Sequence, residues 1–341
     1  MEGFGQASRI RKGDTLSEVI SLVRVGVVGY GTMGQVHSQA LQSIPGAELV
    51  VVADPDPERQ AQAQRDYGVD TVGSIEELLQ AVDVDLVDIC TPTYLHASIF
   101  QEALKAGKHI FCEKPLARTL EEGERLVELS AGYGQKIGIA HVLRFTPAYV
   151  RIRESVVQGR LGKVAVARTS RGGSQFPRGW HDWFADFDLS GGVILDLAVH
   201  DIDYLRWLFG DVQRVYAQST RGRTSAQLEW AFIVLRFKSG VIAHVEAGWS
   251  SSPGEFHTAV EIAGEKGLVD YDSRRAQPIA LAGGAELPLG TLHPYYLELQ
   301  DMIEAIRGDR PPLVTVEDAF QSLKVTLAAL ESAQTGRVVE L

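Results

Sequence analysis

The first 140 positions alternate between short apolar runs and stretches with apolar residues at helical spacing, as is typical of strands that alternate with helices. Apolar, often β-branched runs predict strands at 23–28, 48–53, 71–72, 85–90, 108–112 and 136–140. Helical spacing predicts helices at about 35–44, 55–67, 74–81, 95–106 and 120–131. This alternation predicts an α/β fold with a doubly wound parallel sheet over residues 23–143.

The pattern changes after residue 143, where strands follow one another without intervening helices. Strands are predicted at 163–169, 214–220, 229–237, 241–249 and 259–262, with a hairpin turn at Lys238–Gly240. Helices are predicted at about 145–158, 192–209, 294–307 and 317–333. Consecutive strands favour antiparallel pairing, so residues 144–341 are predicted to form a second α/β domain with a mostly antiparallel sheet. Residues 1–22 are expected to be an N-terminal extension outside the core fold.

The composition is that of an ordinary globular protein and argues against several partners. The chain has 341 residues, 45% of them hydrophobic, and a net charge of −11. This acidic balance argues against nucleic acid, since phosphate binding needs a basic face. No apolar run approaches the ~20 residues that span a membrane, so no membrane partner is expected. Cys90 and Cys112 lie in no metal or redox motif, so we expect buried, reduced thiols in a cytoplasmic protein.

A glycine-rich loop links the first predicted strand to the first predicted helix. It consists of Gly29, Tyr30, Gly31, Thr32, Met33 and Gly34, with the spacing of a dinucleotide-binding turn. The first glycine allows the tight turn, the second lets the backbone approach the phosphates, and the third lets the helix pack against the strand. Free N–H groups at the helix start then face the pyrophosphate. This context favours a Rossmann domain over a glycine turn that binds nothing.

Asp54 ends the second predicted strand about 25 residues after Gly29, near the spacing expected for the acid that binds the ribose. Its carboxylate would accept hydrogen bonds from the adenosine ribose hydroxyls and would repel a 2′-phosphate. We therefore expect NAD as the cofactor, with NADP less favoured. Arg59 and Arg65 on the following helix could weaken this preference.

Lys114 follows the carboxyl end of a predicted strand, where open α/β sheets bind their ligands. An ammonium group there can hold a substrate oxygen and stabilise alkoxide character as hydride leaves carbon. The ring of Pro115 fixes the local backbone and could aim Lys114. By position alone, a surface lysine in a strand-to-helix loop is an equally good interpretation.

Asp196 and His200 are four residues apart in the predicted helix 192–209 and therefore share one face. Their neighbours are mostly apolar, so this face is expected to be partly buried. A carboxylate beside an imidazole orients the ring and raises its pKa, which would make His200 a general base. Asp203, on nearly the same face, is a further candidate partner. The alternative is a core pair in which the two side chains only satisfy each other.

A metal site built from Asp196, His200 and His181 is the less favoured interpretation. The sequence contains neither an H-E-x-x-H motif nor a Cys/His knuckle. Hydride transfer to nicotinamide can proceed without a metal when a lysine and a histidine are present, so we expect none.

These motifs together resemble the glucose–fructose oxidoreductase, inositol dehydrogenase and MocA family of nicotinamide-dependent oxidoreductases, from about residue 24 to residue 341. The resemblance is carried by the glycine loop, Thr91-Pro92-Thr93 with His96, Cys112-Glu113-Lys114-Pro115, and Gly191-Gly192 followed by Asp196 and His200. It implies that the catalytic group is Lys114, Asp196 and His200. It also implies that the glycine loop is joined in cofactor binding by Thr91, Pro92, His96, Glu113 and Lys114. The second sheet is then open, with one face buried between subunits of a homodimer or homotetramer.

The resemblance further implies an NAD-dependent dehydrogenase that oxidises a secondary alcohol of a cyclic polyol or sugar. His200, oriented by Asp196, would accept the hydroxyl proton while hydride passes to NAD⁺, and Lys114 would stabilise the alkoxide. Substrate contacts are expected from Lys114, Asp196 and His200, and also from Arg144, Trp180 and His181. Two alternatives keep the fold: an NAD-dependent glycosidase or sugar–sugar oxidoreductase that retains its cofactor, and a nucleotide-sensing regulator without turnover.

Overall fold

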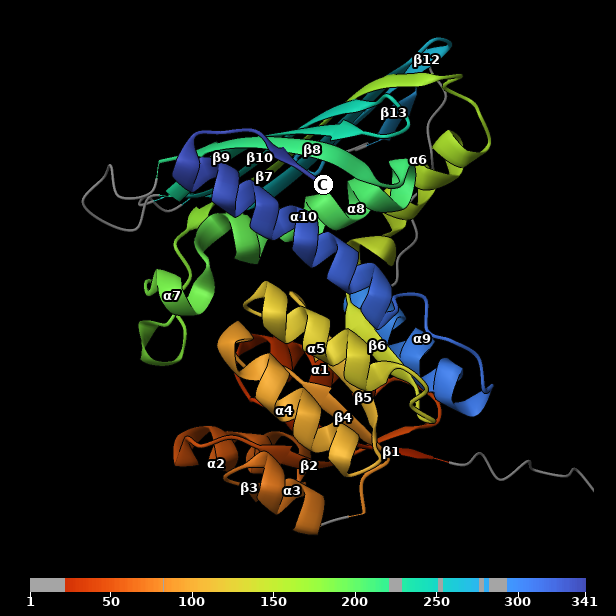
Figure 1. The fold of residues 1–341 in the computed structure, drawn as a ribbon. Coiled ribbons are helices and arrows are strands. Elements are labelled where there is room, and N and C mark those ends of the chain that lie inside the picture. Colours follow the sequence, from red (N-terminus) through yellow and green to blue (C-terminus); the bar gives the residue numbers. More distant parts are fainter. Residues whose placement is uncertain (1–21, 82, 221–228, 251–253, 276–278, 282–292) are drawn as a thin grey trace, which may run out of the picture.

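The computed structural model describes residues 22–341 except 82, 221–228, 251–253, 276–278 and 282–292. The expected N-terminal extension therefore lies, but for its last residue, outside the described residues. Figure 1 shows two stacked parts, one of alternating strands and helices and one built on a large sheet. This arrangement confirms the predicted fold class, an α/β protein with two different sheets.

A six-stranded parallel sheet forms the N-terminal Rossmann domain, in the order β3-β2-β1-β4-β5-β6. Its strands are β1 (Val23–Val28), β2 (Ala47–Ala53), β3 (Asp70–Val72), β4 (Leu86–Ile89), β5 (His109–Glu113) and β6 (Ile137–Ala140). Its helices are α1 (Thr32–Leu41), α2 (Pro57–Tyr67), α3 (Ile75–Ala81), α4 (Thr93–Lys105) and α5 (Leu120–Ser130). The strand order reverses between β1 and β4, and this switch point is where such sheets bind ligands. The predicted strands and helices of this domain are confirmed.

Helices cover both faces of the Rossmann sheet, which explains why its strands are continuously apolar. Val25 and Val27 of β1 are fully buried in a cluster with Leu41 of α1. Val28 belongs instead to a second cluster, with Leu126 of α5. Cys90 and Cys112 are free and buried, as expected.

An eight-stranded mixed sheet forms the second part, in the order β13-β12-β11-β7-β10-β9-β8-β14. Its strands are β7 (Val164–Gln175), β8 (Val212–Ser219), β9 (Glu229–Phe237), β10 (Ile242–Ser250), β11 (His257–Gly264), β12 (Gly267–Asp272), β13 (Ile279–Leu281) and β14 (Val339–Glu340). Among the described pairs only β7 and β10 run parallel. The mostly antiparallel sheet and the hairpin of β9 and β10 are therefore confirmed, whereas β12, β13 and β14 were not predicted.

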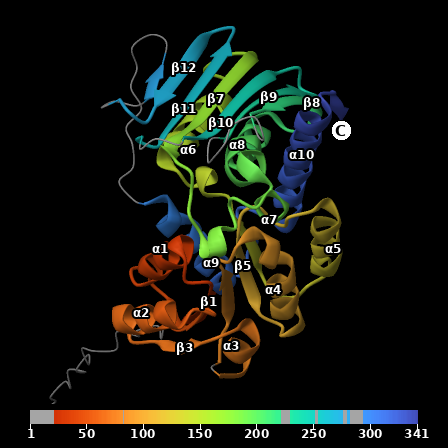
Figure 2. The ribbon, with the colours of Figure 1, turned by 90° about the vertical axis from the view of Figure 1, so that its left-hand side faces the viewer.

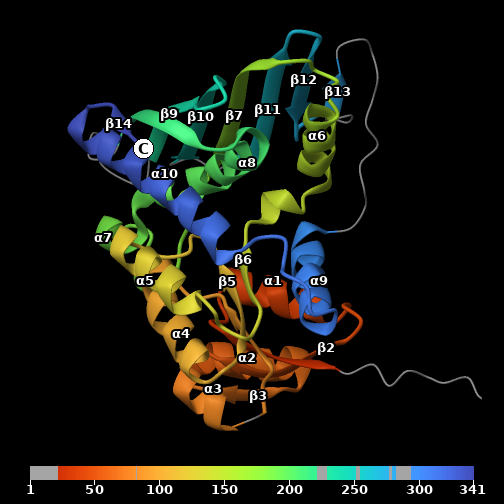
Figure 3. The same ribbon diagram turned by 45° about the vertical axis from the view of Figure 1, so that its right-hand side comes forward.

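The remaining described helices follow the Rossmann domain along the chain. They are α6 (Pro147–Val157), α7 (Phe187–Ser190), α8 (Val199–Phe209), α9 (Pro294–Arg307) and α10 (Val316–Thr335), with short turns η1 (Val142–Arg144), η2 (Trp180–Asp182) and η3 (Ile194–Ala198). The predicted helix 192–209 thus begins with a π-helical turn, η3. Figures 1 and 3 show α8 and α10 on one face of the large sheet. No helix among the described residues is long and apolar enough to cross a membrane.

Helix α9 returns to the Rossmann domain, beside α1 (Figure 2). Leu299, Met302 and Ile303 of α9 share a buried cluster with Val25 of β1. A helix from beyond residue 143 thus packs in the core of the first domain. The domain boundary at residue 143 stays a prediction from the sequence.

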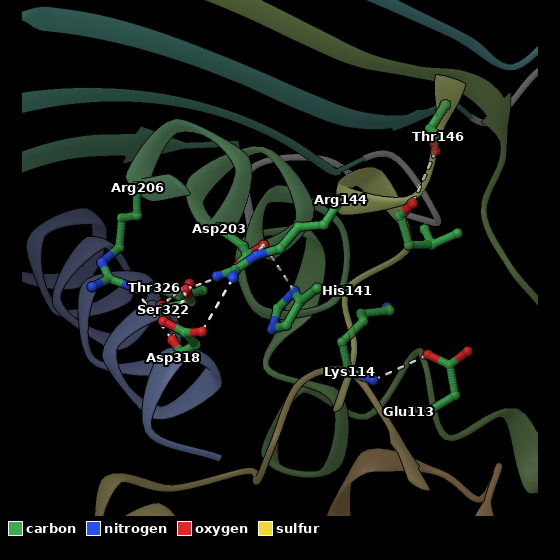
Figure 4. Close-up of polar contacts among 11 residues, drawn as sticks. Glu113, Lys114, His141, Arg144, Thr146, Asp203, Arg206, Asp318, Ser322 and Thr326 are labelled. Atoms are coloured by element: carbon green, nitrogen blue, oxygen red, sulfur yellow. Dashed lines mark hydrogen bonds and ion pairs between the residues drawn. The ribbon is translucent and has the colours of Figure 1, made fainter. Parts of the chain in front are cut away.

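Arg144 forms a buried ion-pair network between η1, α8 and α10 (Figure 4). Its Nε and Nη2 donate to the two carboxylate oxygens of Asp203, at 2.9 and 2.8 Å. Its Nη1 donates to Oδ2 of Asp318 at 3.2 Å, and Oγ of Ser322 donates to Asp203 at 2.8 Å. Burial alone would raise the pKa of Asp203, but His141 and Arg144 outweigh it and lower that pKa. This network holds the end of the Rossmann domain against the second part.

Replacement of Asp203 tests this network. Asp203→Ala should lower the free energy of unfolding in urea by about 3–5 kcal/mol at neutral pH, because it leaves the Arg144 charge buried without its main partner. The lowered pKa means that the stabilisation is present above the unfolded-state pKa of about 3.9 and is lost as pH falls through the folded-state value. The difference between variant and wild type should therefore shrink in acid. Glu154→Ala, which breaks the exposed pair with Arg151, is the control and should cost at most about 1 kcal/mol. Equal losses in the two variants would contradict the assignment.

Candidate active site

The glycine loop has the backbone geometry that a dinucleotide needs. Gly29 has a φ of 92°, and a Cβ there would lie 2.8 Å from the carbonyl oxygen of Cys90. A Cβ on Gly34 would lie 1.9 Å from the carbonyl oxygen of Gly29, so only glycine allows α1 to start this close to β1. Helix α1 has Gly31 as its N-cap and no side chain caps it. Its first N–H groups therefore remain for an anion, and the loop fits a bound pyrophosphate.

A cavity of about 200 Å³ lies over this loop. Its lining includes the expected cofactor residues Gly29, Gly31, Thr32, Met33, Asp54, Thr91 and Pro92, together with Arg59, Arg178, Trp180 and Trp183. The lining therefore brings together the loops that follow β1, β2 and β4 with a segment of the second part.

Asp54 lies at the β2 side of this cavity and is 2% exposed. Its carboxylate accepts hydrogen bonds from the backbone N–H groups of Tyr30 and Asp56, at 2.7 and 2.9 Å. Nη1 of Arg59 is 3.6 Å from the same carboxylate. The side chain of Tyr30 donates to Asp66 instead of entering the cavity, so its part in cofactor binding would come from its backbone.

Trp180 and His181 lie beside the cavity over the nucleotide loops. Trp180 lines the cavity, and the Arg59 guanidinium lies 5.4 Å from the centre of its ring. His181 is exposed next to the Trp180 ring and is not part of the cavity lining. Their expected contacts with the substrate stay a prediction from the sequence.

His96 joins two loops at the carboxyl edge of the sheet. It is 1% exposed, with Nδ1 2.8 Å from the carbonyl oxygen of Pro115 and Nε2 2.9 Å from that of Thr91. The bond between Lys114 and Pro115 is cis. The geometry indicates that His96 positions the loops after β4 and β5 and does not itself reach the cavity.

Lys114 and Asp196 form an ion pair across the two parts of the molecule. Nζ of Lys114 donates to the carboxylate of Asp196 at 3.0 Å and to its backbone carbonyl at 2.8 Å. Both side chains are 13% exposed. The structure thus brings together two of the three expected catalytic residues, and Lys114 is not a free surface lysine.

His200 lies near this pair and is electrostatically coupled to Lys114. Its Nδ1 is buried and has no hydrogen-bond partner among the described residues. Burial, with Lys114, Arg171 and His141 adding to it, lowers the pKa of His200 well below its usual value of 6.5. The expectation that Asp196 raises this pKa is wrong, because the Asp196 carboxylate binds Lys114. His200 is consequently neutral at neutral pH, with a ring nitrogen that can accept a proton.

Two further expectations at this edge need correction. Arg144 is 4% exposed and bound to Asp203 and Asp318, so its guanidinium is not available for a substrate. Asp203 is therefore the partner of Arg144 and not of His200. Sequence spacing could not show this, because the ion pairs join residues that are far apart in the chain.

Two buried histidines near the site were missed by the sequence analysis. His141 follows β6 directly, is 1% exposed, and has Nδ1 3.6 Å from Oδ2 of Asp203 (Figure 4). His37 lies on α1 and is fully buried between Asp88 and Glu113. A histidine immediately after a strand, and a histidine three residues after the last loop glycine, were the available signals.

Comparison with known proteins identifies the family. The chain matches the model of an oxidoreductase family with an NAD-binding Rossmann fold at residues 23–141, and that of the GFO/IDH/MocA C-terminal domain at residues 149–270. A 1,5-anhydro-D-fructose reductase from Ensifer adhaerens is 31% identical over 331 residues, covering 93% of this chain and 98% of the relative. The chain belongs to the Gfo/Idh/MocA family of oxidoreductases. The resemblance found in the sequence is thereby confirmed.

Other Gfo/Idh/MocA proteins agree with this assignment. A scyllo-inositol 2-dehydrogenase (NAD(+)) from Bacillus subtilis is 31% identical over 338 residues, covering 94% of this chain and 96% of the relative. The crystal structure of a scyllo-inositol dehydrogenase from Lactobacillus casei, with bound NAD(H) and scyllo-inositol, has a TM-score of 0.82 at 25% identity and covers 94% and 99% of the two chains. GenD2 from gentamicin A biosynthesis, in complex with NAD, has a TM-score of 0.83 at 25% identity and covers 98% and 99%. The chain is accordingly an NAD-dependent oxidoreductase.

Proposed function

We propose that the protein transfers hydride between a secondary alcohol of a cyclic polyol or sugar and NAD. The observation that carries this proposal is the ion pair of Lys114 and Asp196 at the carboxyl edge of the Rossmann sheet, together with the buried Nδ1 of His200, which has no hydrogen-bond partner among the described residues. The relatives support it, since they are named for inositol and anhydrofructose substrates. They favour it over a glycosidase, a sugar–sugar oxidoreductase or a regulator without turnover.

Lys114 would hold the reacting oxygen. An ammonium group has three N–H donors, and two of them are bound to Asp196. The third can donate to a substrate hydroxyl, with the direction fixed by the first two. The positive charge then stabilises the alkoxide as the hydroxyl loses its proton.

His200 would take that proton. Its lowered pKa keeps the ring unprotonated at neutral pH, so a nitrogen lone pair is available. NAD, when bound in the cleft, supplies the hydride acceptor. Asp196 acts in this proposal by holding Lys114, which differs from the role in orienting His200 that the sequence suggested.

Replacement of His200 tests the base. His200→Ala should lower kcat for polyol oxidation by about 10²–10⁴-fold, the usual contribution of a general base, while NAD⁺ affinity measured by calorimetry is retained. In the wild type, kcat/KM should show no acid limb near pH 6.5, because the pKa of His200 lies well below that value. His109→Ala, at the opposite end of β5, is the control and should keep its turnover. Unchanged kcat in the His200 variant would remove it from the mechanism.

We also propose that NAD is preferred over NADP, because the Asp54 carboxylate would repel a 2′-phosphate. Asp54→Asn keeps the shape of the side chain and removes its charge, so the ratio of kcat/KM for NAD⁺ to that for NADP⁺ should fall roughly tenfold. Arg59, 3.6 Å away from Asp54, would then be paired with Asp56 alone and could face the 2′-phosphate. Asp70→Asn, exposed at the start of β3, should leave the ratio unchanged. An unaltered ratio in Asp54→Asn would refute this explanation.

We further propose that the protein forms a homodimer or homotetramer through the face of the large sheet opposite α8 and α10. Side chains alternate along β9: Ile233 and Leu235 are fully buried, whereas Phe232 and Val234 are 45% and 41% exposed. Three further large side chains of the same sheet stand partly exposed, Tyr216 on β8, Ile242 on β10 and Leu268 on β12. An apolar surface of this kind typically marks an interface.

Light scattering with size exclusion tests this interface. The wild type should be dimeric or tetrameric at micromolar concentration, and Phe232→Glu with Val234→Lys should shift it towards the monomer. Leu313→Glu, which replaces an exposed leucine outside the sheet, is the control and should not change the assembly. A monomeric wild type would exclude the proposal.

A further inference from the structure

A cluster of four buried ionisable residues lies beneath the carboxyl edge of β4 and β5. We call it the His37 cluster: His37 of α1, Asp88 of β4, Glu113 of β5 and Glu298 of α9, each at most 5% exposed. Nδ1 of His37 is 3.0 Å from Oδ2 of Asp88, and its Nε2 is 3.2 Å from Oε1 of Glu113. Glu298 Oε1 lies 3.9 Å from the same Nε2. One imidazole therefore faces three carboxyl groups in the interior.

The protonation of the cluster follows from these contacts. Burial alone would lower the pKa of His37, but Cys90 and Asp88 outweigh it and raise that pKa well above its usual value. Burial, with Glu113 adding to it, raises the pKa of Glu298 well above its usual value. Burial would also raise the pKa of Glu113, yet the contact with His37 outweighs it and lowers that pKa. These shifts favour the imidazolium form of His37, the neutral acid form of Glu298 and the ionised form of Glu113.

Glu113 lies at the carboxyl end of β5, in the half of the Rossmann sheet that receives the nicotinamide. Strands β4, β5 and β6 form the second mononucleotide-binding half, which receives the nicotinamide end when Asp54 binds the adenosine end. Glu113 is the last residue of β5, and its Oε2 accepts a hydrogen bond from the backbone N–H of Lys114 at 3.0 Å (Figure 4). The carboxylate is therefore anchored beside the backbone of the proposed catalytic lysine.

A fixed charge at this place distinguishes the two forms of the cofactor. The nicotinamide ring is cationic in NAD⁺ and neutral in NADH. In a poorly solvated interior, a carboxylate attracts the cationic ring and has little effect on the neutral one. The carboxylate therefore changes the ratio of the affinities for NAD⁺ and NADH. Contacts with the rest of the cofactor contribute equally to both affinities.

We propose that His37 is a positioning residue that keeps Glu113 ionised beneath the nicotinamide end of the cleft, and that this charge favours the binding of NAD⁺ relative to NADH. The inference rests on the proposed function for the placement of the cofactor, and it does not depend on the identity of the polyol. His37 acts through Glu113. Glu298 lies beside the imidazole of His37, and its neutral acid form is favoured.

The test measures the dissociation constants of the full chain for NAD⁺ and NADH separately, by calorimetry and by NADH fluorescence. Glu113→Gln keeps the shape of the side chain and should raise the ratio Kd(NAD⁺)/Kd(NADH) by about threefold or more. His37→Asn should raise it by less than Glu113→Gln does, because Glu113 loses the partner that keeps it ionised while the positive charge of the imidazolium is lost as well. The double variant should match His37→Asn, in which Glu113 has already lost its charge. A purely structural role would weaken both cofactors alike and leave the ratio unchanged.

Two control variants separate charge from packing. Glu298→Gln replaces a carboxyl group that is already neutral, so the ratio should remain within about twofold of the wild type. Asp85→Asn removes a charge at the amino end of the sheet, beside Arg24, and should also leave the ratio unchanged. If His37→Asn does not fold, Glu113→Gln decides the matter alone.

Three outcomes would overturn the inference. The first is an unchanged ratio in Glu113→Gln, and the second is an equal change in Glu298→Gln. The third is a stoichiometric divalent metal in the purified protein by mass spectrometry, since a dication bound to His37 in place of its proton would balance the charges of Asp88 and Glu113 together. A wild type that binds neither cofactor would instead refute the proposed function, which distinguishes the two failures.

Discussion

The ion pair between Lys114 and Asp196 is the contact on which the candidate active site depends. Lys114 belongs to the Rossmann domain and Asp196 to the π-helical turn before α8, 82 residues further along the chain. Both side chains are largely removed from water, so their attraction must offset a considerable desolvation cost. Two hydrogen bonds to the same ammonium supply the geometry that such a pair requires. The site is therefore assembled only when the two parts of the chain dock.

Several other contacts fix that docking. Arg144 ties the end of the Rossmann domain to α8 and α10, and α9 packs its apolar face beside β1. On the cofactor side, Trp180 reaches over the nucleotide loops to Arg59. These contacts surround the carboxyl edge of the parallel sheet. They leave the cofactor cleft and the pair of Lys114 and Asp196 in a fixed relation, which is the preorganisation that hydride transfer requires.

The sequence predicted the features that depend on local pattern. Alternating apolar runs and helical stretches are sufficient for a doubly wound sheet, and Gly34 is required because no other residue fits against Gly29. Sequence pattern could not predict the parallel pairing of β7 with β10, since helices α7 and α8 and strands β8 and β9 lie between these strands in the chain. The pKa of His200 was predicted in the wrong direction for a similar reason. The spacing along one helix predicted that the Asp196 carboxylate binds His200. In the structure this carboxylate binds Lys114, which comes from the Rossmann domain.

The backbone carbonyl of Asp196 gives the ammonium of Lys114 a second support that no side-chain substitution can remove. A substitution at position 196 would therefore change the charge beside the Lys114 amine, while the hydrogen bond to the backbone carbonyl would still hold the amine in place. In relatives built on this scaffold, exchange of the acid for a neutral residue would keep the amine tethered but leave its buried charge without a partner, so the docking of the two domains would need stabilisation elsewhere.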